Sequence, residues 1–415
     1  MESTLLLDRL IGRISTKFTE QLITESLYYN LDFLRVPKFP IYRNSSINTI
    51  DFDRSEGKFL LSGSTDSSIH IFQVDLAPDE ALYYDEIEDE DDEEIKTHRY
   101  KTKALGDLNK RNHDDAHNFG VTCTKWWPFD TGMFLSSSYD GNLKIWDSAT
   151  LSQAFQFELD MKINNFDISK NINSSLICVA TESSHARILD IRTTSAAHTL
   201  TGHHGSLLSC KWNPRDPYVL ATGSSEGEIK LWDIRMTRSC TNDLDLYKTD
   251  VQSEVPLKRK FVGAAQDIVK AHSNNVNGLE FLENGQTLVS TGTDDKIRVW
   301  NLDQSINTLL NFGPFVKNKK TIHKSMIVTP IEEMEVQYLL YPSDNGEIIM
   351  YRMSDGKLVT RLRKVNVNET LKSQNTCLTY CGFNSAVYLS GTSDGRINAW
   401  GNKRNSLIDV NDSDF

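Results

Sequence analysis

The chain has 415 residues, of which 39% are hydrophobic and 25% charged, a composition typical of a folded globular protein rather than a disordered or fibrous one. Its formal net charge is −12, but nine acidic residues lie in the single run DEIEDEDDEE at 85–94. The remainder is near neutral and lacks the basic surface typical of nucleic-acid-binding proteins, so we expect no direct contact with nucleic acid. No apolar run approaches the roughly 18–20 residues of a membrane helix, so we expect an intracellular protein with no membrane span.

Residues 3–24 have the spacing of an amphipathic helix. Apolar side chains recur every three or four positions, and charged side chains occupy the other side. The apolar positions are Leu6, Leu7, Leu10, Ile11, Ile14, Phe18 and Leu22. Such a helix packs either on the chain's own fold or in a groove of a partner. We therefore assign 1–35 as an N-terminal helical segment for docking.

From residue 36 to 400 the sequence repeats itself. Four segments end alike, in LKIW, IKLW, IRVW and INAW, at Trp146, Trp232, Trp300 and Trp400. An acidic residue stands six positions before each tryptophan: Asp140, Glu226, Asp294 and Asp394. Three weaker copies end at Phe72, Leu189 and Tyr351, and the spacing is 43 residues both from Trp146 to Leu189 and from Leu189 to Trp232. Each copy contains short apolar runs separated by tight-turn residues, which indicates β-strands.

A period near 43, with several short strands, a histidine near the start and a tryptophan at the end, is typical of WD repeats. Seven such units close into a ring. We therefore predict an all-β chain, a seven-bladed WD-repeat β-propeller over 36–400 with a short N-terminal helical segment.

The recurring histidines, acids and tryptophans resemble a catalytic set, but they recur once per blade. We expect them to hydrogen-bond with a strand hydroxyl and hold each blade in register. This predicted structural network comprises His117, Asp140, Trp146, His203, Glu226, His272, Asp294, Trp300, Asp394 and Trp400.

Two insertions and a tail do not fit the repeats. We predict that 76–116, with its acidic run, and 241–268 are disordered or mobile loops, and that 401–415 is a C-terminal tail. The acidic run is either a solvated insert or a docking tail for a basic partner. The ring must be closed by a further strand, from either Ser406–Val410 or Phe39–Arg43. We favour the second, because it immediately precedes the first repeat.

No phosphate-binding loop, nucleophile elbow or zinc motif occurs in the sequence, so we predict no enzymatic activity, no metal and no cofactor. Two consecutive repeats, however, end in Asp-Ile-Arg, and equal spacing places both arginines on one face of the ring. A guanidinium can hold a carboxylate or carbonyl through two hydrogen bonds. These arginines either contact a partner or brace the next loop. The candidate contact residues are Asp190, Arg192, Trp232, Asp233 and Arg235.

Four segments resemble the Cockayne syndrome group A family: Ile47–Phe72, Val121–Asp147, Trp212–Arg235 and Ala271–Asn301. FDTGMF at 129–134 is more specific than WD repeats in general. The resemblance extends from about residue 47 to 400, and the acidic insertion departs from the animal pattern, which suggests a fungal member.

The resemblance implies a nuclear function in transcription-coupled nucleotide excision repair. Family members are substrate receptors of a cullin–RING ubiquitin ligase. They attach through its damaged-DNA-binding adaptor, which takes an N-terminal helical segment and WD-x-Arg residues. Helix 3–24, Arg192 and Arg235 are then the adaptor-binding features, and a Cockayne syndrome group B-type translocase and stalled RNA polymerase II are candidate targets. The alternative is a scaffold in transcription or DNA repair without a ubiquitin-ligase role.

Overall fold

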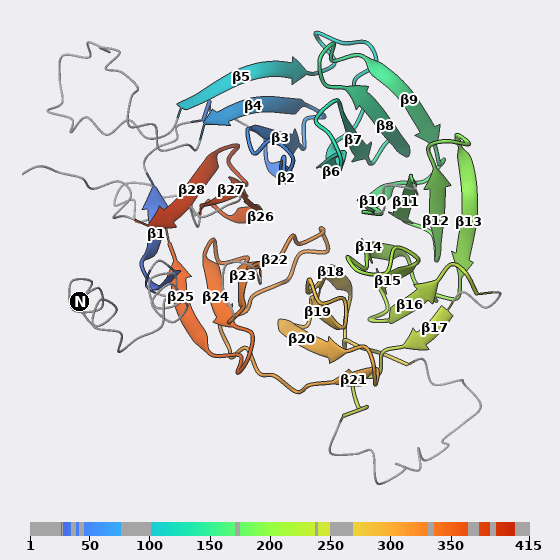
Figure 1. The fold of residues 1–415 in the computed structure, drawn as a ribbon, viewed down its shortest axis with the longest axis vertical. Helices are drawn as coiled ribbons and strands as arrows, with labels where there is room; N and C mark the ends of the chain where they lie inside the picture. The colour runs from blue at the N-terminus through green and yellow to red at the C-terminus, as the bar shows by residue number, and fades with distance from the viewer. Residues whose placement is uncertain are drawn as a thin grey trace, which may run out of the picture.

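Seven four-stranded antiparallel sheets stand around a central axis like the blades of a propeller (Figure 1). They are seen in a computed structural model, which confirms the predicted all-β, seven-bladed fold. The structure describes residues 26, 28–34, 39–40, 45–75, 101–170, 175–236, 240–249, 269–330, 336–363, 373–381 and 387–402. Helix 3–24, the acidic run at 85–94 and the candidate closing strand Ser406–Val410 lie outside these residues.

The strands follow the chain blade by blade, from the innermost strand to the outermost. Blade 1 contains β2 (Ile47–Phe52), β3 (Phe59–Ser64), β4 (Ile69–Asp75) and β5 (Lys101–Leu108). Blade 2 contains β6 (Val121–Trp126), β7 (Met133–Ser138), β8 (Asn142–Asp147) and β9 (Gln153–Glu158). Blade 3 contains β10 (Ile163–Ile168), β11 (Leu176–Thr181), β12 (His185–Asp190) and β13 (Ser195–Thr201). Blade 4 contains β14 (Leu207–Trp212), β15 (Val219–Ser224), β16 (Ile229–Asp233) and β17 (Cys240–Asp243).

The remaining blades follow the same plan. Blade 5 contains β18 (Val276–Phe281), β19 (Thr287–Gly292), β20 (Lys296–Asn301) and β21 (Ile306–Asn307). Blade 6 contains β22 (Ile327–Val328), β23 (Tyr338–Pro342), β24 (Ile348–Arg352) and β25 (Leu358–Leu362). Blade 7 contains β26 (Asn375–Tyr380), β27 (Tyr388–Thr392), β28 (Ile397–Asn402) and, from the other end of the chain, β1 (Leu31–Leu34).

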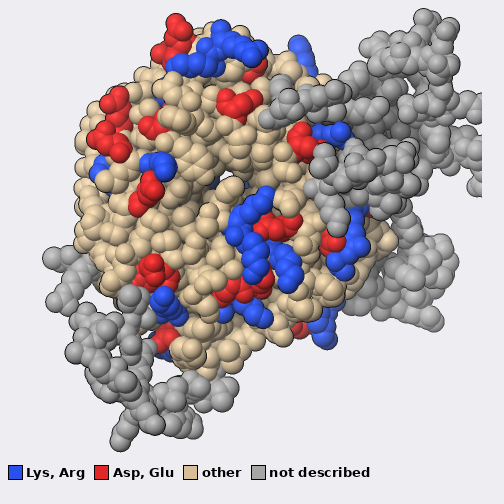
Figure 2. Space-filling model, turned by 180° about the vertical axis from the view of Figure 1, so that it is seen from behind, with Lys and Arg blue, Asp and Glu red and all other residues tan. Residues whose placement is uncertain are grey.

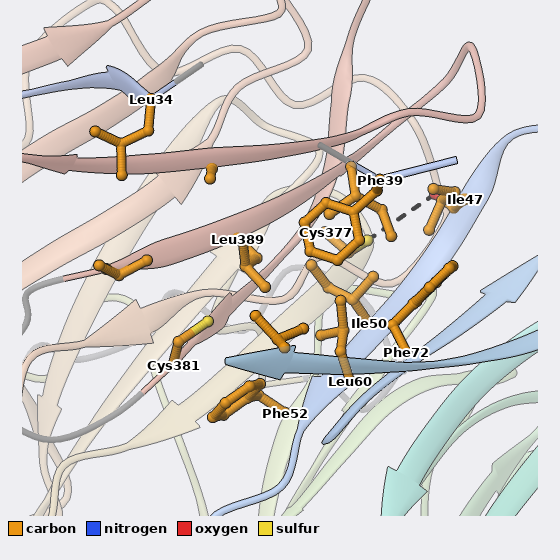
Figure 3. Packing of buried hydrophobic residues seen from close by; sticks show 14 residues of the cluster. Leu34, Phe39, Ile47, Ile50, Phe52, Leu60, Phe72, Cys377, Cys381 and Leu389 are labelled. Carbon is orange, nitrogen blue, oxygen red and sulfur yellow. Dashed lines mark hydrogen bonds between the residues drawn. The ribbon is translucent and has the colours of Figure 1, made fainter. Parts of the chain in front are cut away.

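The hydrophobic core lies between neighbouring blades. The four tryptophans that end the strong repeats are fully buried, as are Phe72, Leu189 and Tyr351 in the equivalent position of the weaker ones, to within 1%. Figure 3 shows the cluster at the junction of blades 7 and 1, where Ile47 and Ile50 of β2 pack near Leu389 of β27. Every blade therefore depends on both of its neighbours for burial of its apolar surface.

The ring is closed by β1, which pairs antiparallel with β28 from Leu31↔Asn402 to Leu34↔Ala399. Closure by the N-terminal side of the chain is confirmed, but the predicted closing segment Phe39–Arg43 is wrong. Phe39 instead contributes its ring to the core, against Phe72 at a centroid distance of 5.5 Å. β1, with the sequence LDFL, lies within 1–35, the segment that we predicted to be for docking. The predicted boundary between this segment and the propeller at residue 35 is therefore also wrong.

Both predicted insertions contain the outermost strand of a blade. β5 lies inside 76–116 and pairs along β4, and β17 runs from Cys240 into the first residues of 241–268 and pairs with β16. These strands are polar because one of their faces meets solvent. The residues of these two strands therefore belong to the blades and not to the insertions. Residues 76–100 and 250–268 lie outside the described part of the chain.

Alternation of strand direction gives the ring two distinct faces. The first and third strands of each blade end on one face, which also carries Arg192 and Arg235 directly after β12 and β16. We call it the arginine face. The second and fourth strands end on the opposite face, where the segments containing His117, His203 and His272 enter the blades. We call that the histidine face, and it is the face seen in Figure 2.

Candidate functional site: the two faces of the propeller

Blade 2 holds a closed polar network around one histidine. His117 Nδ1 lies 2.9 Å from Asp140 Oδ2, and His117 Nε2 lies 2.7 Å from Ser136 Oγ. The indole Nε1 of Trp146 donates to the same Ser136 Oγ at 2.8 Å. The three strand and loop segments that supply these groups are thereby fixed to one another.

The same network recurs in blade 5, and its recurrence explains its role. The equivalent distances are 3.0 Å from His272 Nδ1 to Asp294 Oδ1, 2.8 Å from His272 Nε2 to Ser290 Oγ and 2.8 Å from Trp300 Nε1 to Ser290 Oγ. Burial lowers the pKa of His272, which favours the neutral ring. A neutral, fully hydrogen-bonded histidine repeated in separate blades suits the stabilisation of a fold better than a single reactive centre.

In blade 4, one of the predicted network residues is wrong. His203 Nδ1 lies 3.2 Å from Glu228 Oε2, and the predicted acid Glu226 is half exposed and takes no part. Burial raises the pKa of Glu228, but hydrogen bonds from His203 and His204 outweigh it and hold that pKa at about 2. His203 Nε2 meets Thr222 Oγ1 at 2.6 Å, in place of the serine of blades 2 and 5.

Blade 7 builds a comparable network without a histidine. Ser373 Oγ donates to Asp394 Oδ1 at 2.9 Å, in the place where the other blades have the imidazole. Trp400 Nε1 donates to Ser390 Oγ at 2.8 Å, and Ser390 Oγ in turn donates to Asn375 Oδ1 at 2.9 Å.

The guanidinium of Arg235 is held in a fixed orientation on the arginine face. Its Nε and Nη2 donate to Asp233 at 2.9 and 2.7 Å, and Nη2 also donates to Asp216 at 3.0 Å. The ring of Tyr218 lies beneath it, 4.8 Å from the guanidinium carbon. Half of the Arg235 side chain remains exposed, so the group is oriented and still accessible.

Arg192 repeats this arrangement more loosely, one blade away. Its backbone N–H donates to Asp190 Oδ1 at 2.9 Å and its Nε approaches the same oxygen at 3.5 Å, while 65% of its side chain is exposed. Asp190 and Asp233 are themselves buried and position the arginines. Trp232, by contrast, is fully buried and donates to Thr222 Oγ1, so its side chain has no surface for the predicted contact with a partner.

The N-terminal side of the chain reaches the ring on the arginine face. β1 is the fourth strand of blade 7 and therefore begins on that face. Just before it, Tyr28 stacks on Tyr338 at 5.7 Å, and Arg352, which ends the third strand of blade 6, donates to the hydroxyl of Tyr29 at 2.7 Å. The predicted helix residues Leu6, Leu7, Leu10, Ile11, Ile14 and Phe18 precede this anchor and lie outside the described residues.

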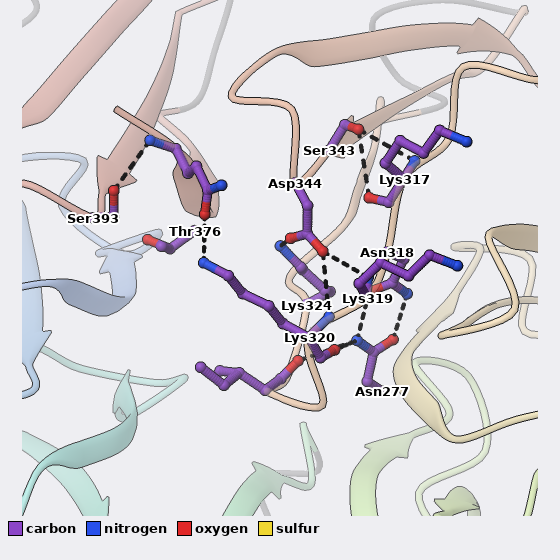
Figure 4. A network of polar contacts seen from close by, with 12 residues as sticks. Asn277, Lys317, Asn318, Lys319, Lys320, Lys324, Ser343, Asp344, Thr376 and Ser393 are labelled. Carbon is purple, nitrogen blue, oxygen red and sulfur yellow. Dashed lines mark hydrogen bonds and ion pairs between the residues drawn. The ribbon is translucent and has the colours of Figure 1, made fainter. Parts of the chain in front are cut away.

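The histidine face has basic side chains beside its central opening (Figure 2). One source is the loop between β21 and β22, whose backbone is fixed by Asp344 and by paired amides of Asn277 and Asn318 at 2.8 Å (Figure 4). This loop presents Lys319, 70% exposed and 2.8 Å from Asp295. The lysine-rich run KNKK was visible in the sequence, but its position at the opening depends on the ring.

Charged side chains also join successive innermost strands. Lys125 of β6 pairs with Asp167 of β10, and Lys211 of β14 pairs with Glu280 of β18 at 2.8 Å. Burial lowers the pKa of Lys125, but the charge of Asp167 outweighs it and raises that pKa overall. These pairs tie neighbouring blades together, and sequence spacing gave no sign of them because their partners are over 40 positions apart.

Among the described residues, no group of three or more His, Cys, Asp and Glu side chains is placed to hold a metal ion. In the same part of the chain, no helix is long and apolar enough to cross a membrane.

The WD domain, G-beta repeat family matches residues 109–147, 194–233 and 264–301, which end with the third strands of blades 2, 4 and 5. With seven four-stranded blades and the recurring His-acid-hydroxyl-Trp networks, the chain is a WD-repeat β-propeller.

Two known proteins match this chain over most of its length. WD repeat-containing protein ATCSA-1 of Arabidopsis thaliana is 28% identical over 360 residues, covering 74% of this chain and 77% of that protein. Radiation-sensitive protein 28 of Saccharomyces cerevisiae is 29% identical over 312 residues, covering 69% of this chain and 58% of that protein. A ribosome biogenesis protein WDR12 homolog of Dictyostelium discoideum is 29% identical over 186 residues, which is 43% of this chain and 35% of that protein. The chain is thus a WD-repeat protein related to the Cockayne syndrome group A family.

Proposed function

We propose that this protein is a non-catalytic substrate receptor of a cullin–RING E3 ubiquitin ligase, acting in transcription-coupled nucleotide excision repair in the nucleus. The observation that carries the proposal is the pair of oriented, accessible arginines on neighbouring blades of one face. Relatedness to the Cockayne syndrome group A family supplies the biological setting.

Arg235 is prepared for a contact across an interface. Asp233 and Asp216 hold its Nε and Nη2, and Tyr218 supports its flat side, so little side-chain entropy remains to be lost on binding. No hydrogen bond from its Nη1 is found within the described part of the chain, which leaves that nitrogen to donate to a carbonyl or carboxylate of the adaptor. Arg192 provides a second, more mobile contact.

The N-terminal anchor supports the same face as the docking surface. The described chain enters the ring beside Tyr29 and Arg352, on the face that carries both arginines, and the predicted helix 3–24 precedes this entry in the sequence. We propose that this helix occupies a groove of a damaged-DNA-binding-type adaptor while the arginines contact a neighbouring surface. The histidine face then stays free for the target, of which a Cockayne syndrome group B-type translocase and RNA polymerase II are the candidates.

The test is affinity purification from the source organism after transcription-blocking damage, with quantitative mass spectrometry. Wild type is compared with Arg192→Ala/Arg235→Ala and with a chain lacking residues 1–24. We expect a cullin and its adaptor with wild type and at least a tenfold loss in both variants. Arg187→Ala is the matched arginine control, because Arg187 lies within β12 and not after its end.

Recovery of polymerase and repair factors without any cullin in all four samples would instead identify a scaffold with no ubiquitin-ligase role. Unchanged cullin recovery in both docking variants would show that the arginine face is not the docking surface.

A further inference from the structure

A pocket of about 480 Å³ opens on the histidine face between blades 2 and 3. It lies away from the arginine face, so a ligand bound there leaves Arg192 and Arg235 accessible. Its walls are the turn between β7 and β8, the loop from β9 to β10 and the turn after β11. None of the residues used in the preceding section lines it.

Apolar side chains form an exposed floor and rim. Tyr139 and Met161 line the pocket with 37% and 41% of their surface exposed. Phe119, 63% exposed, belongs to the segment paired with this turn, since the backbone N–H of Tyr139 donates to the carbonyl of the next residue, Gly120, at 3.2 Å. Tyr139 and Met161 therefore give the pocket an exposed apolar lining, and exposed apolar patches are typical of interaction sites.

The charge of the pocket is negative. Asp160 and Glu182 are exposed in its wall, and Asp140, whose side chain is nearly buried, also lines it. The single ammonium group in the wall is that of Lys162, 3.4 Å from Glu182. Because His117 occupies Asp140, two exposed carboxylates face one ammonium group, and this acidic wall complements a basic side chain rather than an acidic one.

The pocket is also built to keep its shape. Gly141 has φ +81°, a conformation that side-chain-bearing residues rarely adopt, and a Cβ there would lie tightly against the carbonyl oxygen of Met161, at 3.2 Å. Within blade 3, the N–H of Glu182 donates to the carbonyl of Lys162 at 2.9 Å, which fixes the loop before β10 to the turn after β11. A preformed pocket loses little conformational entropy when a ligand enters.

We propose that this pocket binds a linear segment of a partner protein in which a lysine or arginine stands next to a bulky apolar residue. The apolar side chain packs on Tyr139 and Met161, and the basic group meets Asp160 and Glu182. The inference does not depend on the ligase role, because a receptor and a scaffold both need a surface for their partner.

The probe is an array of dodecapeptides in which Lys or Arg flanks Leu, Ile, Met or Phe, with a second array that carries Glu in place of each basic residue. The full chain is applied to both, and the best binders are measured in solution by fluorescence polarisation. We expect the basic array to contain peptides that bind at least ten times more tightly than their Glu counterparts.

Two variants locate the site. Asp160→Asn/Glu182→Gln keeps the shape and removes the charge, and asparagine tolerates the positive φ of 56° at position 160. Tyr139→Ala removes part of the apolar floor. We expect each to weaken the best peptide at least fivefold without changing the thermal unfolding temperature. Tyr247→Ala and Asp303→Asn, exposed and outside this pocket, are the matched controls and should leave binding unchanged.

The proposal is overturned if the two arrays bind equally, if the Glu array binds better, or if the charge-removing variant binds the best peptide as wild type does. Loss of binding in the controls as well as the site variants would place the peptide elsewhere on the propeller.

Discussion

In blades 2, 4 and 5 one strand hydroxyl accepts from a tryptophan indole and bonds a histidine, so a single side chain satisfies two other buried polar groups. Ser290 does this for Trp300 and His272. Its exposed surface is 0%, so water is not available to replace it.

We therefore predict that Ser290→Ala lowers the free energy of unfolding by about 2 kcal/mol, because the indole N–H and an imidazole nitrogen are left buried without a partner. Urea unfolding followed by tryptophan fluorescence measures this loss. Ser195→Ala removes an exposed bond to Thr193 and should change the free energy by less than about 0.5 kcal/mol. Equal losses in the two variants would contradict the structural role of the network.

Glu228 gives the network a pH dependence with a definite sign. Its pKa is about 2 in the folded chain against an ordinary value of 4.5, so its contribution is complete above pH 4.5 and is lost as pH falls towards 2. We predict that Glu228→Gln destabilises the protein by about 2 kcal/mol at pH 7, and that wild type and variant converge as pH falls from 5 to 3. Urea midpoints measured across this range would contradict the assignment if the gap stayed constant.

The tryptophan positions and most network acids could be predicted because they recur at fixed spacing. Glu226 was predicted in place of Glu228 because two acids stand within three residues of the same turn. Only the geometry of that turn, with Gly227 at φ +85°, shows which carboxylate faces His203. The hydrogen bond from Arg235 to Asp216 could not be predicted either, because the two residues are 19 positions apart in the sequence.

At the scale of elements, the inner strands of a blade can be recognised from the sequence and the outer strands cannot. β7 is buried at five of six positions and reads as an apolar run, whereas β13 is exposed at six of seven. An outer strand lacks the apolar pattern because solvent covers one side of it. This is why β1, β5 and β17 were assigned to a docking segment or to insertions.

The closing strand provides a prediction at this scale. Removing residues 1–34 deletes β1 and the ring of Tyr28 and should lower the thermal unfolding temperature by about 10 °C, because the buried faces of β28 and Tyr388 lose their cover. Removing residues 1–24 leaves β1 in place and should shift that temperature by less than about 2 °C. Equal shifts, measured by differential scanning fluorimetry, would show that β1 does not close the ring.

At the scale of the whole molecule, the ring separates two surfaces. The arginine face carries Arg192, Arg235 and the N-terminal entry beside Tyr29, while the histidine face carries the pocket at Tyr139. The number of blades and the common face of the two arginines could be predicted, since both follow from the period of the repeats. The pocket could not, because its walls come from turns of two different blades that only the closed ring brings together.

The most direct measurement of the central proposal is the affinity of the purified chain for the damaged-DNA-binding-type adaptor of its own organism, by biolayer interferometry. We predict a dissociation constant below about 1 μM for wild type and at least tenfold weaker binding for Arg192→Ala/Arg235→Ala, with Arg187→Ala unchanged. No binding by wild type, or equal binding by wild type and the double variant, would contradict docking through the arginine face.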